Sequence, residues 1–221
     1  LNYTAMAVLN SGPNGGFSGK AGSVVGYFQY GQWRIRGLPK LSAKNRKGSS
    51  KQNICRSRFS KMQDFLRPVL PFIRIGFNLE SKRNHNSAHN SAKSWNMLNA
   101  FNEEGEIDYT TFRFSMGNLP GAEDAAIEEQ EDQLIISWRD NSGDTGEDKY
   151  LREDDQVMIL IYDIKTPFTL GTMSGARRSA GQEIVKIERF KYLTEYHIWI
   201  SFISDDRQRI ANSKYVGMVM L

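Results

Sequence analysis

With 221 residues, a single cysteine and a formal net charge of +4, the chain has room for one large domain or two small ones, and an internal disulfide is excluded. It contains no run of about 18 or more apolar residues and no visible signal peptide, so we expect no membrane span and favour the cytoplasm or a virion over secretion. Residues 1–100 hold 16 Lys and Arg against 2 Asp and Glu, whereas residues 101–221 hold 13 against 23. Such a contrast is typical of polyanion binding, of head-to-tail contact between subunits, or of two halves that neutralise each other within one fold.

Residues 1–40 are rich in glycine and aromatic side chains and hold no acidic residue. Closely spaced glycines exclude a stable helix, because each interior glycine costs about 1 kcal/mol relative to alanine. We predict a hairpin with strands at 27–30 and 32–36 around a tight turn at Gly31, and a free 27–30 edge that adds a strand to a partner's sheet. The alternative is an arm that becomes ordered only against a partner or its own C-terminal domain. The residues predicted to contact a partner are Phe17, Lys20, Tyr27, Phe28, Tyr30 and Trp33.

Residues 41–105 form a basic segment in which the pattern becomes helical. Ser49 or Ser50 is a candidate cap for a helix over 51–67, and Pro68 and Pro71 are expected to break or kink that helix. Residues 72–77 are a further helical turn or a strand, and we favour the helix. This segment can also present a basic surface to a polyanion, for which the candidate residues are Lys40, Lys44, Arg46, Lys47, Lys51, Arg56, Arg58 and Lys61.

A second helix is predicted over residues 87–101, and its buried side is expected to be Ala88, Ala92, Trp95 and Leu98. His85 and His89 stand at a spacing that metal ligands use, but no third ligand is close in sequence. We therefore expect exposed histidines and no metal at this position.

From Glu106 onward the pattern changes to short strands separated by turns. The predicted strands are 107–115, 134–138, 157–162, 168–173, 183–190, 196–203 and 214–221. Six or seven strands at this spacing predict an antiparallel sandwich of the immunoglobulin or fibronectin type III kind. The predicted fold is therefore α+β: a Gly-rich arm or hairpin over 1–40, short helices over 41–105 and a β-sandwich over 106–221.

The acidic loop at 140–148 resembles a calcium-binding loop superficially. An EF-hand would require a glutamate where Leu151 stands, so we favour a solvated loop between strands. An irregular calcium site remains the alternative, because hard cations accept many arrangements of oxygen ligands.

Several motifs along the chain carry a resemblance to a known family. They are Leu9–Gly12, Gly15–Gly26, Arg36–Pro39, Arg58-Phe59, Ile73–Phe77, Ile107–Tyr109, Trp138–Gly143, Ala176–Gly181 and Asn212–Gly217. With these motifs the chain resembles a family of uncharacterised Bacteroidetes proteins that is classed as a domain of unknown function. The resemblance implies no activity, and it supports the fold just described.

Residue patterns that would indicate catalysis are weak. A P-loop around Gly19-Lys20 would need a glycine at Asn14 and a serine or threonine at Ala21. Cys55 has no histidine near it in sequence, and His197 lies in an alternating strand. We therefore expect no enzyme, no cofactor and no bound metal.

The leading hypothesis is a structural or assembly protein, a phage-like or surface-assembly subunit whose arm contacts another subunit of the same or another protein. Nucleic-acid binding through the basic half is the first alternative, with Tyr30 or Trp33 stacking on bases. A carbohydrate-binding or adhesive module is the second alternative, and it depends on the fold and the aromatic residues alone.

Overall fold

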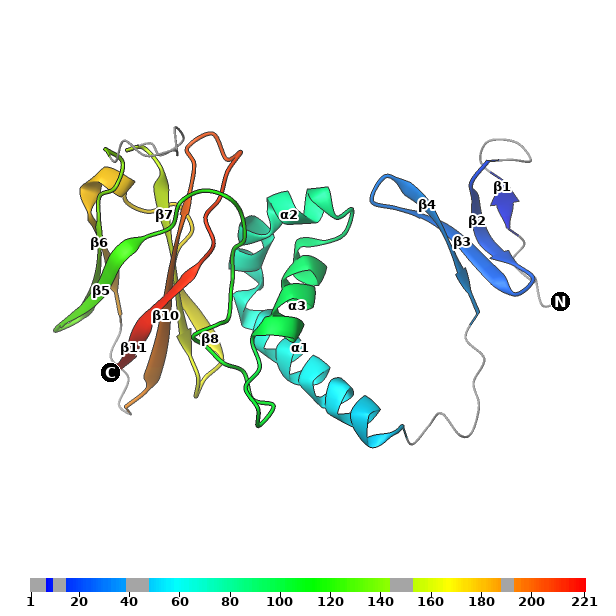
Figure 1. Cartoon of the computed structure of the whole chain (residues 1–221), viewed down its shortest axis with the longest axis horizontal. Helices are drawn as coiled ribbons and strands as arrows, with labels where there is room; N and C mark the ends of the chain where they lie inside the picture. Colours follow the sequence, from blue (N-terminus) through cyan, green and yellow to red (C-terminus); the bar gives the residue numbers. More distant parts are fainter. Residues whose placement is uncertain (1–6, 10–14, 39–47, 144–152, 188–192) are drawn as a thin grey trace. The chain divides into compact units, whose positions relative to one another are not determined.

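The structure, a computed structural model, describes residues 7–9, 15–38, 48–143, 153–187 and 193–221. The chain divides into two compact units, Leu1–Asn53 and Ile54–Leu221. Antiparallel sheets dominate the described ranges and combine with three helices, in agreement with the predicted α+β class (Figure 1). Within these ranges, no helix is both long enough and apolar enough to cross a membrane.

The first unit holds a four-stranded antiparallel sheet, which we call the N-terminal sheet. Its strands follow chain order: β1 (Val8–Leu9), β2 (Phe17–Ala21), β3 (Val24–Gln29) and β4 (Gln32–Gly37). The predicted hairpin around Gly31 is confirmed, since Gln29 pairs with Gln32 and both turn residues have positive φ, 52° at Tyr30 and 76° at Gly31. Two positive φ values match the twist of the flanking strands in a two-residue turn.

The predicted free edge at 27–30 is wrong. Strand β3, which contains Tyr27, is paired on both sides, so the edges of the N-terminal sheet are β1 and β4. A second tight turn at Gly22, whose φ is 58°, folds β2 back onto β3 and occupies that edge.

Helix α1 (Ser50–Gly76) is longer than predicted. The predicted cap at Ser49 is confirmed. It is part of a capping box, in which the Ser49 hydroxyl accepts from Gln52 N and the Gln52 side chain accepts from Ser49 N. Of the predicted break or kink at Pro68 and Pro71, the break is wrong, because the helix runs through both prolines. The two prolines lack the N–H groups that would donate within the helix. Burial of the neighbouring Leu66, Val69, Phe72 and Ile73 offsets this loss, because each buried side chain contributes about 1.5–3 kcal/mol.

Two shorter helices follow, α2 (Asn78–Arg83) and α3 (Ala88–Asn99). The buried side of α3 was predicted correctly at Ala92 and incorrectly at Leu98, which is 83% exposed. Asn96 is fully buried instead. Its side chain donates to the backbone oxygens of Ala92 and Arg113 and accepts from Arg113 N.

This use of Asn96 explains why the predicted strand at 107–115 is absent from the structure. The backbone of Arg113 bonds to the Asn96 amide, and Phe114 N donates to the Ser213 hydroxyl, so side chains take the place of a partner strand. The alternating pattern has another origin: Phe112 and Phe114 are both buried beneath the helices.

The rest of the second unit is a sandwich of two antiparallel sheets. The described strands are β5 (Glu123–Gln130), β6 (Gln133–Arg139), β7 (Gln156–Asp163), β8 (Phe168–Thr172), β9 (Gln182–Lys186), β10 (Glu195–Ile203) and β11 (Lys214–Met220). One sheet has the order β11-β10-β7-β8 and the other β5-β6-β9. A short 3-10 turn, Arg178–Ala180, precedes β9.

The strands predicted over 134–138, 157–162, 168–173, 196–203 and 214–221 are confirmed within one or two residues. The predicted strand 183–190 corresponds to β9, and residues 188–190 lie outside the described ranges. Strand β5 was missed, because its acidic residues resembled a loop. Ala125 and Ile127 pack against the interior of the sandwich.

The helices and both sheets form three layers in the second unit (Figure 1). Leu160, Tyr162 and Trp199 of the four-stranded sheet pack against Phe65 and Phe112 on the helical side. The opposite face of the same sheet packs on the three-stranded sheet. Strands β7 and β10 are thus buried on both faces, and the segments 41–105 and 106–221 share one hydrophobic cluster from Met62 onward.

Candidate functional site

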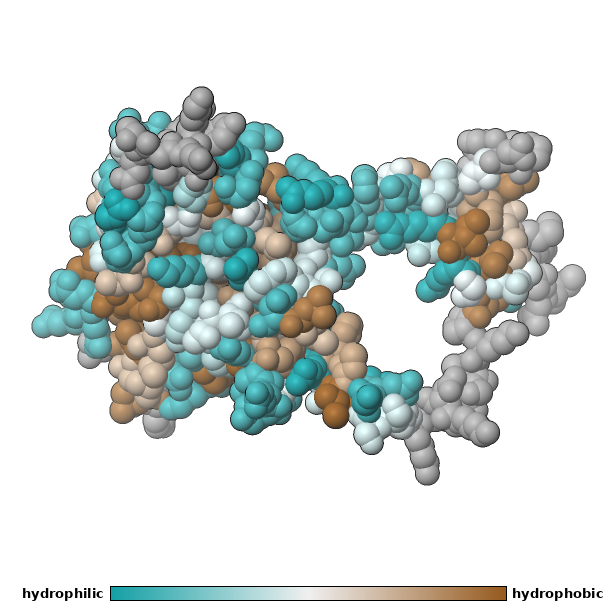
Figure 2. Space-filling view, in the orientation of Figure 1, coloured by the Kyte–Doolittle hydropathy of each residue, from teal (hydrophilic) through white to brown (hydrophobic). Residues whose placement is uncertain are grey.

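The N-terminal sheet has one apolar face. Residues opposite each other in register share a face of a sheet, and the register pairs Phe28 with Trp33, Gly26 with Ile35 and Leu9 with Phe17. The apolar face therefore consists of Leu9, Phe17, Ala21, Val24, Phe28, Trp33 and Ile35. Figure 2 shows hydrophobic side chains at the surface of this sheet.

Aromatic rings on the apolar face lie directly on glycine backbone. A Cβ atom at Gly26 would overlap the Phe17 ring, and one at Gly16 would overlap the Trp33 indole. Phe28 and Trp33 meet edge to face, with ring centroids 5.1 Å apart. Gly16 and Gly26 therefore serve close packing of aromatic rings, whereas Gly22 and Gly31 serve the turns.

The apolar face has little cover within its own unit. Phe28 is 59% exposed, Ile35 65% and Leu9 58%, and among the residues of strands β1–β4 only Gly26 is buried. A contiguous exposed apolar patch of this kind marks a protein contact surface more often than a solvated surface.

The opposite face of the N-terminal sheet is largely polar and basic, although Val8 and Val25 also lie on it. It carries Lys20, Tyr27, Arg34 and Arg36, which the register places together. The Arg36 guanidinium lies 6.0 Å from the centre of the Tyr27 ring, and that of Arg34 lies 5.9 Å from the Tyr30 ring. We call this the basic face.

The structure divides the predicted partner-contact residues between two surfaces. Phe17, Phe28 and Trp33 lie on the apolar face, Lys20 and Tyr27 lie on the basic face, and Tyr30 is in the turn. The prediction missed members of both faces, namely Leu9, Val24, Ile35, Arg34 and Arg36. The alternation Trp33-Arg34-Ile35-Arg36 was the signal in the sequence that could have revealed them.

The predicted polyanion residues do not form one described surface. Lys40, Lys44, Arg46 and Lys47 lie outside the described residues, and Lys51 and Arg56 are exposed on α1.

The other two of these residues, Arg58 and Lys61, contact their own chain. The Lys61 ammonium contacts the Glu106 carboxylate and donates to Gly105 O at 3.3 Å. The Arg58 guanidinium lies 5.4 Å from the centre of the Phe101 ring.

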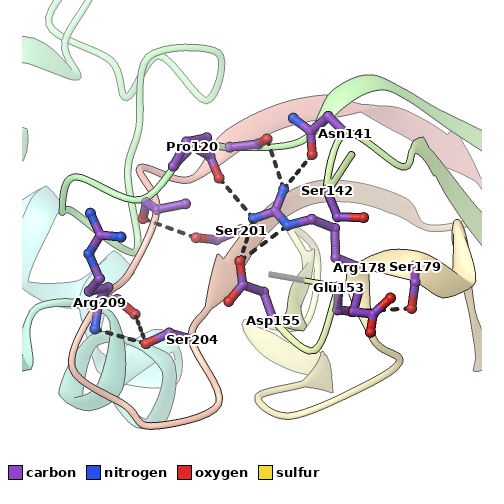
Figure 3. Close-up of polar contacts among 12 residues, drawn as sticks. Pro120, Asn141, Ser142, Glu153, Asp155, Arg178, Ser179, Ser201, Ser204 and Arg209 are labelled. Atoms are coloured by element: carbon purple, nitrogen blue, oxygen red, sulfur yellow. Dashed lines mark hydrogen bonds and ion pairs between the residues drawn. The ribbon is translucent and has the colours of Figure 1, made fainter. Parts of the chain in front are cut away.

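Arg178 forms a buried polar cluster that the sequence did not reveal. Its side chain is 0% exposed, and so is that of its ion-pair partner Asp155, at 3.3 Å. Nη1 donates to Asn141 Oδ1 at 2.9 Å, and Nη2 donates to Pro120 O at 3.0 Å (Figure 3). The guanidinium also lies 3.8 Å from the centre of the Phe202 ring. This arrangement ties four segments of the sandwich together, so we assign it a structural role.

His197 forms a second polar cluster, on strand β10. Its Nδ1 lies 2.8 Å from the Tyr215 hydroxyl, and its Nε2 lies 3.1 Å from Glu195 Oε1. The Tyr109 ring packs on the imidazole with centroids 4.1 Å apart. Burial lowers the pKa of His197 below its ordinary value of 6.5, and the Glu195 carboxylate opposes that shift.

The lowered pKa of His197 predicts how stability depends on pH. The unfolded chain takes up a proton near pH 6.5 while the folded chain resists it, so the free energy of unfolding should fall as the pH decreases through that value. His89, whose pKa burial also lowers, acts in the same direction. Urea unfolding measures the free energy of unfolding at about pH 7.5 and at about pH 5.5. The decrease of that free energy between the two pH values should be smaller for His197→Gln than for the natural chain. Equal losses in both proteins would contradict this prediction.

The candidate metal positions do not converge in the described part of the chain. His85 lies in a turn with a φ of 48°, while His89 lies in α3 beside the Gln63 amide. Among the described residues, no three His, Cys, Asp or Glu side chains form a group that could hold a metal ion. Of the acidic loop, Asn141 binds Arg178, and residues 144–148 lie outside the described ranges.

A family match covers both units of the chain. Residues 16–217 match a family of unknown function, DUF6266. The chain belongs to this family. The DUF6266 match includes strands β2–β4 of the N-terminal sheet together with the three helices and most of the sandwich. No curated protein matches the chain.

Proposed function

We propose that this DUF6266 chain is a non-catalytic assembly subunit whose N-terminal sheet binds a second copy of the chain through its apolar face. The observation that supports this most directly is the exposure of Phe28, Trp33 and Ile35 on one side of a sheet without a core of its own. Burying such side chains contributes about 1.5–3 kcal/mol each. Contact with another subunit would supply that burial.

The second unit offers a complementary surface for this contact. On the outer side of the three-stranded sheet, Ile135 pairs in register with Ile184, which is 46% exposed, and with Glu128. The adjacent edge strand β5 holds four carboxylates: Glu123, Asp124, Glu128 and Glu129. Glu123 and Asp124 form ion pairs with Arg139 of their own chain, so the surface offers a second copy an apolar centre with a mixed charged border. Contact between unlike surfaces of two copies produces a ring or a filament.

Substitutions on the two faces of the N-terminal sheet test the assembly proposal. The double variant Phe28→Thr with Ile35→Thr should weaken self-association about a hundredfold, because it removes two large apolar side chains. The matched control is Gln29→Thr with Arg34→Thr, which makes the same change at neighbouring positions on the opposite face. Analytical ultracentrifugation over a range of concentrations measures both. Equal association by the two variants would refute the proposal.

Nucleic-acid binding is the second candidate, supported by the basic face rather than by helix α1. Lys20, Arg34 and Arg36 lie together with Tyr27, an aromatic ring on which a base can stack. Neutralising three phosphates of a single strand gives a slope of about −2 in log K against log salt concentration. A titration with a fluorescent oligonucleotide at several salt concentrations measures the slope. The Gln29→Thr/Arg34→Thr variant should bind more weakly here, whereas Phe28→Thr/Ile35→Thr should not.

Narrower expectations from the sequence stay predictions. They are the likeness of the sandwich to immunoglobulin or fibronectin type III domains, the Bacteroidetes origin, the phage-like or surface setting, and the carbohydrate-binding or adhesive alternative. The assembly experiment is independent of all of them, because it measures association alone.

A further inference from the structure

A pocket of about 300 Å³ lies in the second unit, apart from the N-terminal sheet. Its walls come from the end of α1, from α2, from the residues after β8 and from the loop between β10 and β11. The apolar part of its lining is Ile75, Leu79, Met173, Ile203 and Ile210. A volume at the lower end of the range for ligand sites, with mostly apolar walls, fits a small organic molecule.

Two arginines line this largely apolar pocket, together with the polar side chains of Asn78 and Ser174. Arg74 extends from α1 and Arg207 from the loop between β10 and β11, and the lining includes no acidic side chain. Neither guanidinium has a carboxylate partner within the described part of the chain. Nη2 of Arg207 donates to the Ser174 hydroxyl at 2.8 Å and to the Gln156 amide, which fixes its position at the rim.

The backbone of Arg207 has an unfavourable conformation for its residue type. Its φ is 57°, in the left-handed region that glycine adopts at little cost and residues with a Cβ atom adopt unfavourably. A hairpin loop alone would be more stable with glycine at this position. The turn therefore does not explain an arginine at this position, and Arg207 is one of the residues that line the pocket.

We propose that this pocket binds a small carboxylic acid with an aliphatic body. The carboxylate lies between Arg74 and Arg207, since guanidinium groups match carboxylates in geometry and charge. The hydrocarbon part lies on Leu79, Ile203 and Ile210. A neutral alcohol lacks the charge that pairs with the two arginines, and an inorganic anion lacks the hydrocarbon that contacts the apolar lining. Both should therefore bind poorly.

Calorimetric titration of the full chain tests the ligand class with three probes. Octanoate should bind saturably, at least about tenfold more tightly than 1-octanol, which has the same body without the charge. Inorganic phosphate, a charge without a body, should also bind at least about tenfold more weakly than octanoate. Octanoate binding no tighter than either of the other two probes, or no binding at all, would overturn the proposal.

Two variants identify the pocket as the place of binding. Arg207→Gly should weaken octanoate binding about tenfold or more while leaving the thermal midpoint unchanged or raising it, because glycine relaxes the turn. Arg74→Gln should weaken binding as well, whereas Arg67→Gln, two turns earlier on the same helix, should not. Unchanged affinity in Arg207→Gly would overturn the proposal. So would an equal loss of affinity in Arg74→Gln and Arg67→Gln.

Discussion

Replacing Arg178 with methionine is expected to lower the free energy of unfolding by about 3–5 kcal/mol, because it leaves Asp155 buried and without its ion-pair partner. The variant also removes the donors to the buried Asn141 Oδ1 and to the partly buried Pro120 O. Chemical denaturation of the full chain measures the loss directly. Methionine keeps most of the aliphatic volume, so the effect reports the charge and the hydrogen bonds more than a cavity.

Arg177→Met is the matched control for this prediction. Arg177 is adjacent in sequence and also forms an ion pair, with Asp154, but its side chain is 66% exposed. Exposed pairs contribute about 0–1 kcal/mol, so this variant should unfold almost like the natural chain. Similar losses for the two variants would show that burial is not what makes the Arg178 cluster important.

Replacing Phe65 with alanine should cost about 3–5 kcal/mol, the range for truncating a large core aromatic residue. Phe65 is 5% exposed, and its ring contacts Tyr109, Phe112 and Tyr162 at centroid distances of 5.7, 4.7 and 4.8 Å. One side chain thus joins helix α1, the segment after α3 and the four-stranded sheet. The helices and the sandwich should therefore unfold together in a single transition.

Phe59→Ala is the control on the same helix. Phe59 is 51% exposed and contacts the Lys93 ammonium, so its truncation should cost well under half as much. Urea unfolding followed by both circular dichroism and tryptophan fluorescence measures both variants. Separate transitions for the helical and strand signals in Phe65→Ala would contradict a shared core.

Strands with both faces buried could be predicted from the sequence because their composition leaves few alternatives. The continuous apolar run Val157–Tyr162 is typical of a strand that other elements cover on both faces, and it forms β7. The acidic strand β5 was missed because only Ala125 and Ile127 pack on the interior. In that strand the pairing with β6 decides the structure, and pairing is not visible in local composition.

The errors at residues 107–115 and at the prolines of α1 have a common physical cause. In each place the local sequence favours the predicted structure, but a tertiary contact stabilises a different one. Asn96 satisfies the backbone of Arg113 in place of a strand, and burial around Pro68 and Pro71 keeps the helix intact. Single-sequence patterns contain neither contact.

The candidate surfaces could be predicted in composition but not in geometry. The aromatic residues of the N-terminal sheet and Lys20 were identified, but Arg34 and Arg36 were missed, because the division of the residues between two faces depends on strand register. Arg58 and Lys61 looked equivalent to other basic residues of the helix. Their contacts with Phe101 and Glu106 lie more than forty residues away in sequence.

The most direct test of the assembly proposal is the light-scattering mass of the full chain at physiological salt, with ultraviolet absorbance recorded on the same peak. We expect a defined multimer without nucleic acid that becomes a monomer in the Phe28→Thr/Ile35→Thr variant. A natural chain that remains a monomer at all concentrations would contradict the proposal, because its apolar face would then have no partner subunit. A peak that carries nucleic acid would favour the basic face as the functional surface.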